Sequence, residues 1–380
     1  MREVDREVEA RSASDAARLR TELRAEAHAA PAQAERPRLA SFARSWLEAR
    51  TTEVKASTAE FYALMLDLHI IPHFGEHYLD SITETDIARW RDAMSGAPAS
   101  RNGRLRALRT LLEAAVPRFL SYNPASRVRP ARAVRIDRSP NRLTANELRD
   151  VLEHLRAQHE RSLAALERAC EERPGPRDRV PMAYPMVLAL VSTGARWGEM
   201  SALRFGDIDE AAGVIHIRRA HWKGIVDTTK TGTVRTVPLT PELSRVLREH
   251  RRLLVATQHP GLSSGLVFPS ATGEHRRPKS IDKPFAAALA KAGIERRQTI
   301  HGLRRTFNDL LRQVASGEVV RSMTGHSTVE MTEHYSHVGA AEKAGAVARA
   351  LGDIARGGDT GGDSNDEGAG ALAPTPVIVP

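Results

Sequence analysis

The chain has 380 residues, enough for two domains, and its 56 Lys and Arg against 47 Asp and Glu give a formal net charge of +9. This basic balance favours a polyanionic partner, nucleic acid above all. The single cysteine, Cys170, excludes an internal disulfide framework and a cysteine-based metal cluster. The N-terminus has no apolar signal core, and no apolar run approaches the roughly 20 residues of a membrane span. We therefore expect a soluble, cytoplasmic protein with no membrane partner.

The two ends of the chain are predicted to lie outside its folded domains. Residues 1–36 are rich in Ala, Arg and Glu, which predicts a helical, partly disordered extension. Within residues 1–30 six Arg face seven acids, so this extension is nearly neutral and is not expected to hold DNA by charge alone. Residues 357–380 carry four acids and no Lys or Arg among Gly and Pro, which predicts a disordered acidic tail.

Residues 37–125 are predicted to form a small all-α domain, because four stretches place apolar residues at helical spacing. The third of these helices begins at Thr83 and Asp86, and the fourth spans residues 100–120. We expect the aromatic residues of this domain in its core. The apolar stripes of the first, third and fourth helices are Leu39, Phe42, Ala43, Trp46, Leu47, Ile87, Trp90, Met94, Leu105, Leu108 and Leu112.

The second helix of this domain is predicted from a capping-box signature, Ser57 followed three residues later by Glu60. Pro72 is predicted to end it, since proline cannot continue a helix without losing a hydrogen bond. Its apolar face is expected at Phe61, Leu64, Leu68 and Ile71.

Arginine dominates the end of this domain and the linker predicted at residues 126–142. From Pro98 to Arg135 the chain has nine Arg and one acid, Glu113, and Arg106 and Arg109 are expected to project away from the leucine stripe. A solvated face usually mixes both signs, so this block favours a surface that follows DNA phosphates. The alternative is a linker that is merely soluble. The predicted DNA-binding residues are Arg101, Arg104, Arg106, Arg109, Arg127, Arg129 and Arg132.

A second domain is predicted over residues 143–356. A capping box of Thr144 and Glu147 starts its first helix, and an apolar helix ends at the Thr-Gly turn before Arg196. The clear β signal lies in residues 214–239, where two runs are expected to pair around a turn at Thr231-Gly232. Helices are predicted again from Pro241, Ser280 and His301.

Breaking a phosphodiester requires positive charge on the phosphate oxygens, a nucleophile in line and a proton for the leaving oxygen. Asp207 and Asp209 could bind a metal ion, but they have no third partner at metal-site spacing. A metal site at the three histidines His326, His334 and His337 is the other alternative. Arginine is favoured over both, because its planar guanidinium matches phosphate and stays charged. No metal and no cofactor are expected.

The segment from His301 to His337 carries the residues suited to this chemistry. His301 and Arg304 are three apart, hence on one face of a predicted helix start, and Arg305 is the alternative to Arg304. Gly325 and His326 follow at a turn, and Tyr335 follows nine residues after His326. A tyrosine phenol, with an ordinary pKa near 10, attacks well only beside cations and a proton acceptor.

Four motifs in this order resemble the tyrosine recombinase (phage integrase) family, over about residues 38–350. TGARWGEMSALRFGDID resembles the family's first arginine block and points to Arg196. TTKTGTVRTVPL resembles its β-hairpin lysine block and points to Lys230, with Lys223 as the alternative. HGLRRTF resembles the His-x-x-Arg box, and GHSTVEMTEHYSH resembles the final box with its tyrosine. Trp197 and Glu199 are interpreted as packing and buttressing residues rather than as part of the chemistry, and Trp222 as sheet core rather than as a base-stacking platform.

The resemblance implies a mainly α fold with a small antiparallel β-sheet (α+β), arranged as a two-domain DNA clamp. It implies that Arg196 and Arg304 bind the scissile phosphate, that Tyr335 attacks it, and that Lys230 protonates the 5′-oxygen. His301 would assist proton transfer from the phenol, and His326 would hydrogen-bond the phosphate. Its expected partners are double-stranded DNA of the nucleoid, three further copies in a homotetramer and accessory DNA-bending proteins. The alternatives are a non-catalytic DNA-binding protein, an Xer-like dimer-resolution enzyme and a topoisomerase-like enzyme.

Overall fold

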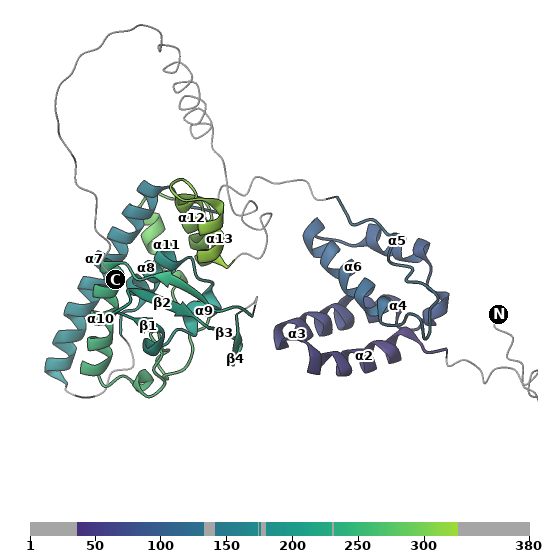
Figure 1. Cartoon of the computed structure of the whole chain (residues 1–380), viewed down its shortest axis with the longest axis horizontal. Helices are drawn as coiled ribbons and strands as arrows, with labels where there is room; N and C mark the ends of the chain where they lie inside the picture. Colours follow the sequence, from purple (N-terminus) through teal and green to yellow (C-terminus); the bar gives the residue numbers. More distant parts are fainter. Residues whose placement is uncertain (1–35, 133–140, 174, 176–179, 230–231, 326–380) are drawn as a thin grey trace, which may run out of the picture. The chain divides into compact units, whose positions relative to one another are not determined.

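A computed structural model of the chain describes residues 36–132, 141–173, 175, 180–229 and 232–325. The chain divides into a first unit, Met1–Asp137, and a second unit, Arg138–Pro380. Figure 1 colours the chain from purple at its start to yellow at its end, so the helices labelled α2 to α6 belong to the first unit.

The described part of the first unit is helical. The fourfold helical pattern of the sequence is confirmed there, although one helix is split by a wider turn and short turns lie between the others. Its segments are α2 (Leu39–Glu53), α3 (Ala56–Met65), the π-helical turn η1 (Leu66–Ile70), α4 (Ile71–Phe74), the 3₁₀ turn η2 (Leu79–Ser81), α5 (Glu84–Ala93) and α6 (Pro98–Glu113).

Apolar side chains of α2, α4, α5 and α6 form the core of the first unit. Trp90 is buried and meets Phe74 edge to face, with 5.4 Å between ring centroids. At the start of α5, Thr83 and Asp86 make the predicted reciprocal capping box. Not all aromatic side chains lie in the core as expected, since Tyr122 is 64% exposed.

The start of the second helix differs from the prediction. α3 begins at Ala56 with Lys55 as its N-cap, so Ser57 and Glu60 lie inside the helix and do not form the predicted capping box. The helix also continues past Pro72, which lies in the first turn of α4. The preceding π-helical turn, with its wider i→i+5 bonding, accompanies this continuation through a residue that has no N–H to donate.

The buried face of this helix was predicted wrongly at three of four positions, because only Ile71 of the predicted residues packs against the core. Phe61, Leu64 and Leu68 are 37%, 43% and 59% exposed. A second set of apolar residues at helical spacing is buried instead, and its members are Ala59, Leu66, Ile70 and Phe74. Both sets satisfy the 3.6-residue period, so the period alone could not decide which one faces the core.

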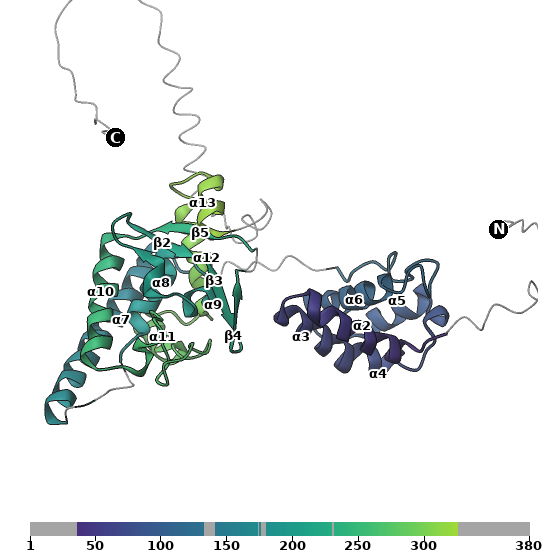
Figure 2. The same ribbon diagram turned by 60° about the horizontal axis from the view of Figure 1, so that its bottom comes forward.

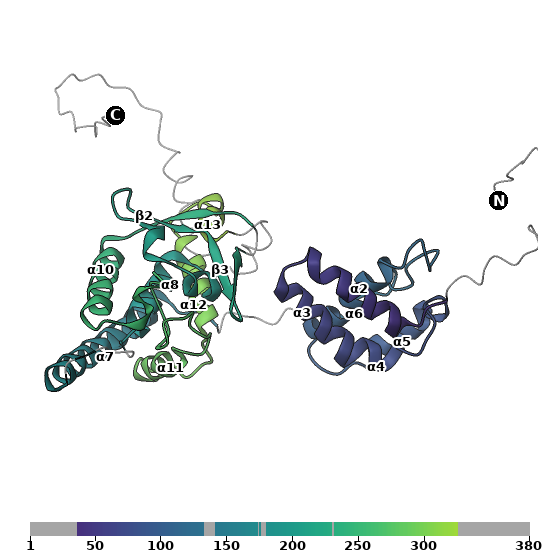
Figure 3. The ribbon, with the colours of Figure 1, turned by 90° about the horizontal axis from the view of Figure 1, so that it is seen from below.

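The helices of the second unit gather around α8, as the views in Figures 1 and 3 show. α8 is apolar on all sides and buried along nearly its whole length, and α7, α10 and α12 pack against it. The helical segments are α7 (Ala145–Glu172), α8 (Ala183–Thr193), α9 (Trp197–Ser201), η3 (Phe205–Asp207), α10 (Pro241–Ala256), η4 (Pro260–Leu262), α11 (Asp282–Lys291), α12 (Ile300–Leu311) and α13 (Gly317–Thr324).

Two small antiparallel sheets complete the second unit, and Figure 2 shows the hairpin β3–β4 apart from β2 and β5. The first sheet has the order β1-β2-β5, with Ile215 opposite Val237, so the two predicted runs do pair. The second sheet, inserted between them, was not predicted. The strands are β1 (Ile208–Asp209), β2 (Val214–Ile217), β3 (Arg219–Trp222), β4 (Ile225–Thr228) and β5 (Arg235–Pro238).

A tight hairpin turn that was not predicted lies at Lys223-Gly224, whereas the predicted turn at Thr231-Gly232 lies partly outside the described residues. Both Lys223 and Gly224 have positive φ, 46° and 88°, as a two-residue turn between twisted strands requires. The mainly α fold with small antiparallel sheets is confirmed. None of the described helices is both long enough and apolar enough to cross a bilayer.

Candidate active site

Arg304 is the centre of the candidate site and one of the most deeply buried side chains of the second unit, 2% exposed on α12. Its Nη1 donates to the carbonyl oxygen of Gly194, 2.6 Å away, and its Nη2 donates to the carbonyl oxygen of Thr324. These carbonyls lie at the C-terminal ends of α8 and α13, where the helix dipole is negative. The guanidinium therefore joins the ends of two helices far apart in sequence.

Gly194 has to be glycine for this arrangement. Its φ is +61°, and a Cβ added there would lie 2.3 Å from the ring of Phe307 on α12. The left-handed turn ends α8 and brings the chain to Arg196 within two residues. The close approach of α12 thus places the carbonyl of Gly194 within reach of Arg304.

Arg196 is held in place by the carboxylate of Glu199. Its backbone N–H donates to Oε2 of Glu199 at 2.8 Å, and its Nη1 donates to Oε1 at 2.9 Å. The Arg196 side chain is 20% exposed and that of Glu199 is 1% exposed. One carboxylate thus fixes the main chain and the side chain of Arg196 together, in the supporting role expected of Glu199.

Arg235 of β5 belongs to the same network, although it was not among the predicted site residues. Its Nη2 donates to Oε2 of Glu199 at 2.6 Å, and its Nε donates to the carbonyl oxygen of Met323 on α13 at 2.8 Å. Its side chain is 8% exposed. The signal that could have revealed it is strand alternation, because Arg235 shares its face of β5 with the fully buried Val237.

The charges of this network determine the state of the buried acid. Burial raises the pKa of the Glu199 carboxyl, but the hydrogen bond and the charge of Arg235, together with Arg196, outweigh burial. The pKa of Glu199 therefore stays below its ordinary value, and at neutral pH the carboxylate is charged. A charged Glu199 is required to hold two arginines at once.

His301 lies in the first turn of α12, which starts one residue earlier than predicted, and it is exposed. The hydroxyl of Thr299 accepts from the backbone of Gly302 and caps this helix start. The segment before α7 also contacts the helix start, because Oδ1 of Asn141 accepts from the backbone N–H of Thr299 at 3.1 Å. A methyl group on Gly302 would lie 2.5 Å from that oxygen.

Three of the predicted site residues, Lys230, His326 and Tyr335, lie outside the described residues. Described residues border two of them: Thr229 is buried just before Lys230, and Gly325 ends α13 just before His326. Through Gly194 and Thr324, Arg304 contacts residues two positions before Arg196 and two positions before His326. The predicted arginines are thus connected to one another and to the start of the final motif.

The structure also describes three alternative site residues, Lys223, Arg305 and Asp207. Lys223 is exposed at the β3–β4 turn, with its Nζ 5.3 Å from the ring centre of Trp222, which is only half-buried. Arg305, the neighbour of Arg304, is half-buried. The carboxylate of Asp207 accepts from Arg219 at 2.8 Å and from the backbone of Arg204 at 3.0 Å, which gives it a structural use.

The predicted DNA-binding arginines divide into two groups. Arg106, Arg127, Arg129 and Arg132 are exposed. Others donate to backbone carbonyls of the first unit: Arg101 to Arg91, Arg104 to Ser95, and Arg109 to Ala125 and Val128. Arg109 therefore does not simply project away from the leucine stripe as expected, because its guanidinium holds the turn after α6.

Comparison with known proteins identifies the family. Residues 141–342 match the phage integrase family, and residues 38–95 match the N-terminal SAM-like domain of phage integrases. The chain belongs to the phage integrase family. Members of this family are tyrosine site-specific recombinases. The mainly α second unit with its small sheets has the integrase catalytic fold.

Among relatives, the chain is 27% identical to the prophage phiRv2 integrase of Mycobacterium tuberculosis over 304 residues, 78% of this chain and 70% of that protein. It is 26% identical to tyrosine recombinase XerC of Mesorhizobium japonicum, over 80% of this chain and 92% of that protein.

Solved integrases share the fold. The Tn1549 transposon integrase in complex with transposon right end DNA matches with a TM-score of 0.63 at 17% identity, over 83% of this chain and all of that chain. A lambda integrase tetramer bound to a Holliday junction matches with a TM-score of 0.57 at 19% identity, over 85% of this chain and 86% of that chain.

Proposed function

We propose that this family member is a site-specific DNA recombinase that cleaves and rejoins strands through a 3′-phosphotyrosyl intermediate. The observation that carries the proposal is the buried guanidinium of Arg304, which is bound by helix-end carbonyls of Gly194 and Thr324. The cation is fixed in advance of any substrate, as stabilisation of a phosphoryl-transfer transition state requires. Arg196, fixed by Glu199, supplies the second cation.

In this mechanism Tyr335 attacks the phosphorus, and the bond from phosphorus to the 5′-oxygen breaks. Lys230 donates a proton to that 5′-oxygen, His301 assists removal of the phenolic proton, and His326 hydrogen-bonds the phosphate. One phosphodiester is exchanged for another, so rejoining to a second strand requires no ATP. Arginine supplies the positive charge that a metal ion would otherwise supply, and the proposal includes no metal or cofactor.

We further propose residues 37–125 as the core-binding domain and residues 143–356 as the catalytic domain, joined by the basic linker 126–142. Double-stranded DNA is the substrate, and a homotetramer on two sites is the active assembly, with accessory DNA-bending proteins as partners. The prophage integrase relative favours integration and excision of a mobile element. The XerC relative, most of whose length is matched, favours resolution of chromosome or plasmid dimers as the second candidate.

The test is covalent trapping on a nicked suicide substrate, built from inverted repeats beside the coding region. Wild type is expected to form a protein–DNA adduct that survives denaturing electrophoresis, and Tyr335→Phe is expected to bind the same DNA without forming it. Binding without an adduct in wild type would favour a non-catalytic DNA-binding protein. Relaxation of supercoils without exchange of strands between duplexes would favour a topoisomerase-like enzyme.

A further inference from the structure

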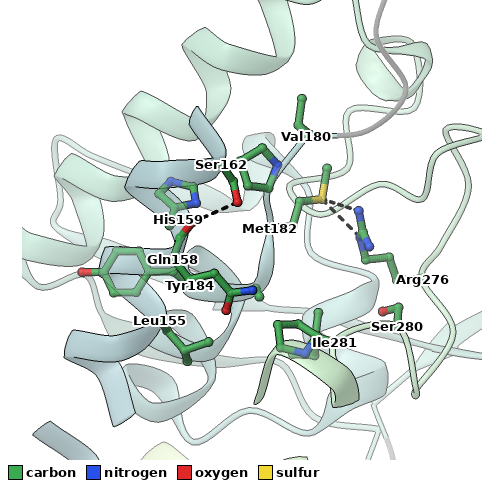
Figure 4. Close-up of a pocket in the computed structure, with 13 residues that line it drawn as sticks. Leu155, Gln158, His159, Ser162, Val180, Met182, Tyr184, Arg276, Ser280 and Ile281 are labelled. Carbon is green, nitrogen blue, oxygen red and sulfur yellow. Dashed lines mark hydrogen bonds between the residues drawn. The ribbon is translucent and has the colours of Figure 1, made fainter. Parts of the chain in front are cut away.

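A pocket of about 220 Å³ lies between α7, the segment that enters α8 and the residues that lead into α11. It includes none of the residues of the candidate active site. Figure 4 shows its lining, with His159 and Arg276 on opposite sides. Its polar residues include Gln158, His159, Ser162, Arg276 and Ser280, and its apolar residues include Leu155, Val180, Met182, Ile281 and Pro284.

Arg276 is the unusual residue of this pocket. Its Nε and Nη2 both donate to the sulfur of Met182, at 3.1 and 2.8 Å. Among the residues that the structure describes, no carboxylate lies within ion-pair distance of it. A thioether is a weak acceptor, and burial lowers the pKa of the guanidinium without an opposite charge to offset it.

The edge of Arg276 that faces the sulfur is the edge that binds a carboxylate with two parallel hydrogen bonds. Met182 therefore occupies the position of a stronger, charged acceptor. Methionine has three rotatable bonds and adapts to a changed neighbour, so its sulfur can be displaced at low cost. The Arg276 segment itself is anchored, because its carbonyl oxygen accepts from the hydroxyl of Ser201 on α9 at 3.2 Å.

A second polar group adds to this binding capacity. The Nδ1 of His159 is buried, with no hydrogen-bond partner among the described residues, which is costly unless a ligand provides one. Its ring lies 5.7 Å from that of Tyr184, and burial lowers its pKa, so the imidazole is neutral at neutral pH. A neutral imidazole offers one N–H donor and one acceptor to a bound molecule.

We propose that this pocket binds a small organic anion, with a carboxylate on the Nε–Nη2 edge of Arg276 in place of the Met182 sulfur. The apolar body of the ligand packs against Leu155 and Ile281 on the pocket wall. Size limits that body to one ring or a short chain, since a cavity of about 150 Å³ admits benzene. The hydroxyl of Ser280 and the ring of His159 offer further hydrogen bonds, whereas the hydroxyl of Ser162 already donates to the carbonyl oxygen of Gln158 at 2.9 Å.

Calorimetry on the full chain without DNA tests this proposal, with benzoate as the probe and benzamide as its uncharged counterpart. Benzoate is expected to bind at least about tenfold more tightly than benzamide, because only benzoate forms the charged bidentate pair. Arg276→Gln should weaken benzoate binding at least about tenfold. The matched control, Arg277→Gln, removes the neighbouring exposed charge and should leave binding unchanged.

Two further measurements guard against a folding effect. Met182→Leu removes the competing sulfur and retains the apolar volume, so it should bind benzoate as tightly as wild type or more tightly. Circular dichroism melts should show that Arg276→Gln remains folded. Equal affinity for benzoate and benzamide, equal losses in Arg276→Gln and Arg277→Gln, or binding of inorganic phosphate as tight as that of benzoate would each overturn the proposal. No DNA takes part, so the result is independent of the recombinase function.

Discussion

The two units use arginine in opposite ways. In the first unit Arg104 donates to the carbonyl of the exposed Ser95, where water can replace a lost partner, and the half-buried Arg109 donates to carbonyls without an ion pair to a buried carboxylate among the described residues. In the second unit Arg304 and Arg235 are buried and bind helix-end carbonyls and a buried carboxylate. Loss of a buried charged partner leaves the remaining groups unsatisfied away from water. The first unit should therefore tolerate arginine loss, whereas the second should not.

The largest effect is expected from Arg304→Lys. Lysine retains the positive charge but lacks the planar fork that reaches the carbonyls of Gly194 and Thr324 together. We expect the rate of covalent trapping on the suicide substrate to fall by at least about 100-fold, or about 2.7 kcal/mol of transition-state stabilisation. Near-normal trapping by this variant would show that charge alone suffices and would remove the contrast between the units.

Arg235→Gln should give the next largest effect, about tenfold or more in trapping rate, because Glu199 then holds Arg196 without its second cation. Arg235→Lys retains a charge and should recover part of the rate. A merely structural role would lower thermal stability in both variants without this partial recovery.

The same substitution should change the dependence of stability on pH. In wild type the folded-state pKa of Glu199 is lowered, so its contribution is present above the unfolded pKa and is lost as pH falls through the folded one. Removal of Arg235 raises the folded-state pKa. Acid unfolding, followed by circular dichroism, should therefore begin at a higher pH in Arg235→Gln, and an unchanged acid limb would contradict the account of this network.

A partly exposed pair gives an intermediate case. Arg296 donates to both oxygens of Glu147, and its hydrogen bonds outweigh burial and lower the Glu147 pKa from 4.5 to about 2. Its stabilisation should be complete above pH 4.5 and lost between pH 4.5 and 2. The side chain of Glu147 is 26% exposed and that of Arg296 is 36% exposed, so solvent weakens the pair. We expect Glu147→Gln to lower the free energy of unfolding in urea by about 1 kcal/mol at pH 7, and to leave it unchanged near pH 2.

The exposed Glu153 of the same helix provides the control for this measurement. Glu153→Gln should leave the free energy of unfolding unchanged at both pH values. If Glu153→Gln matched Glu147→Gln, the stabilisation would come from the net charge of α7 rather than from the pair with Arg296.

Effects no larger than that of Glu147→Gln are expected in the first unit, from Arg106→Gln and Arg109→Gln. Arg106 is exposed, so its loss should lower the salt slope of DNA binding by about 0.9 without a change in stability. Arg109 binds Ala125 and Val128, so its loss should cost about 1 kcal/mol of stability. DNA-binding titrations at several salt concentrations measure the first effect, and urea unfolding measures the second. If both variants changed the salt slope and the stability equally, the predicted difference between Arg106 and Arg109 would be wrong.

Local signals in the sequence predicted local structure well. Thr83 with Asp86 and Thr144 with Glu147 mark real helix starts, because a capping box is completed within four residues. Ser57 with Glu60 has the same kind of pattern, but both residues lie inside α3, which begins at Ala56. The hairpin at Lys223-Gly224 was missed because lysine is uncommon at positive φ.

The candidate site was only partly predictable. The motifs predict Arg196 and Arg304 as site residues, but they do not predict that Arg304 is buried against Gly194 and Thr324, because those carbonyls lie 110 and 20 residues away. Arg235 was missed for the same reason, since Glu199 lies 36 residues before it. The sequence shows which residues are charged, whereas the groups that they contact depend on how helices and strands pack together.

The bond between Arg304 and the last carbonyl of α13 has a further consequence. Thr324 is separated from Tyr335 by only ten residues, so the arginine proposed to bind the phosphate also holds the helix end that precedes the proposed nucleophile in sequence. A substitution that unwinds the end of α13 would therefore disturb both Arg304, which is proposed to bind the phosphate, and the helix end that precedes Tyr335 in sequence. Thr324→Pro, for example, would lower the rate of strand cleavage, although Thr324 has no proposed contact with DNA.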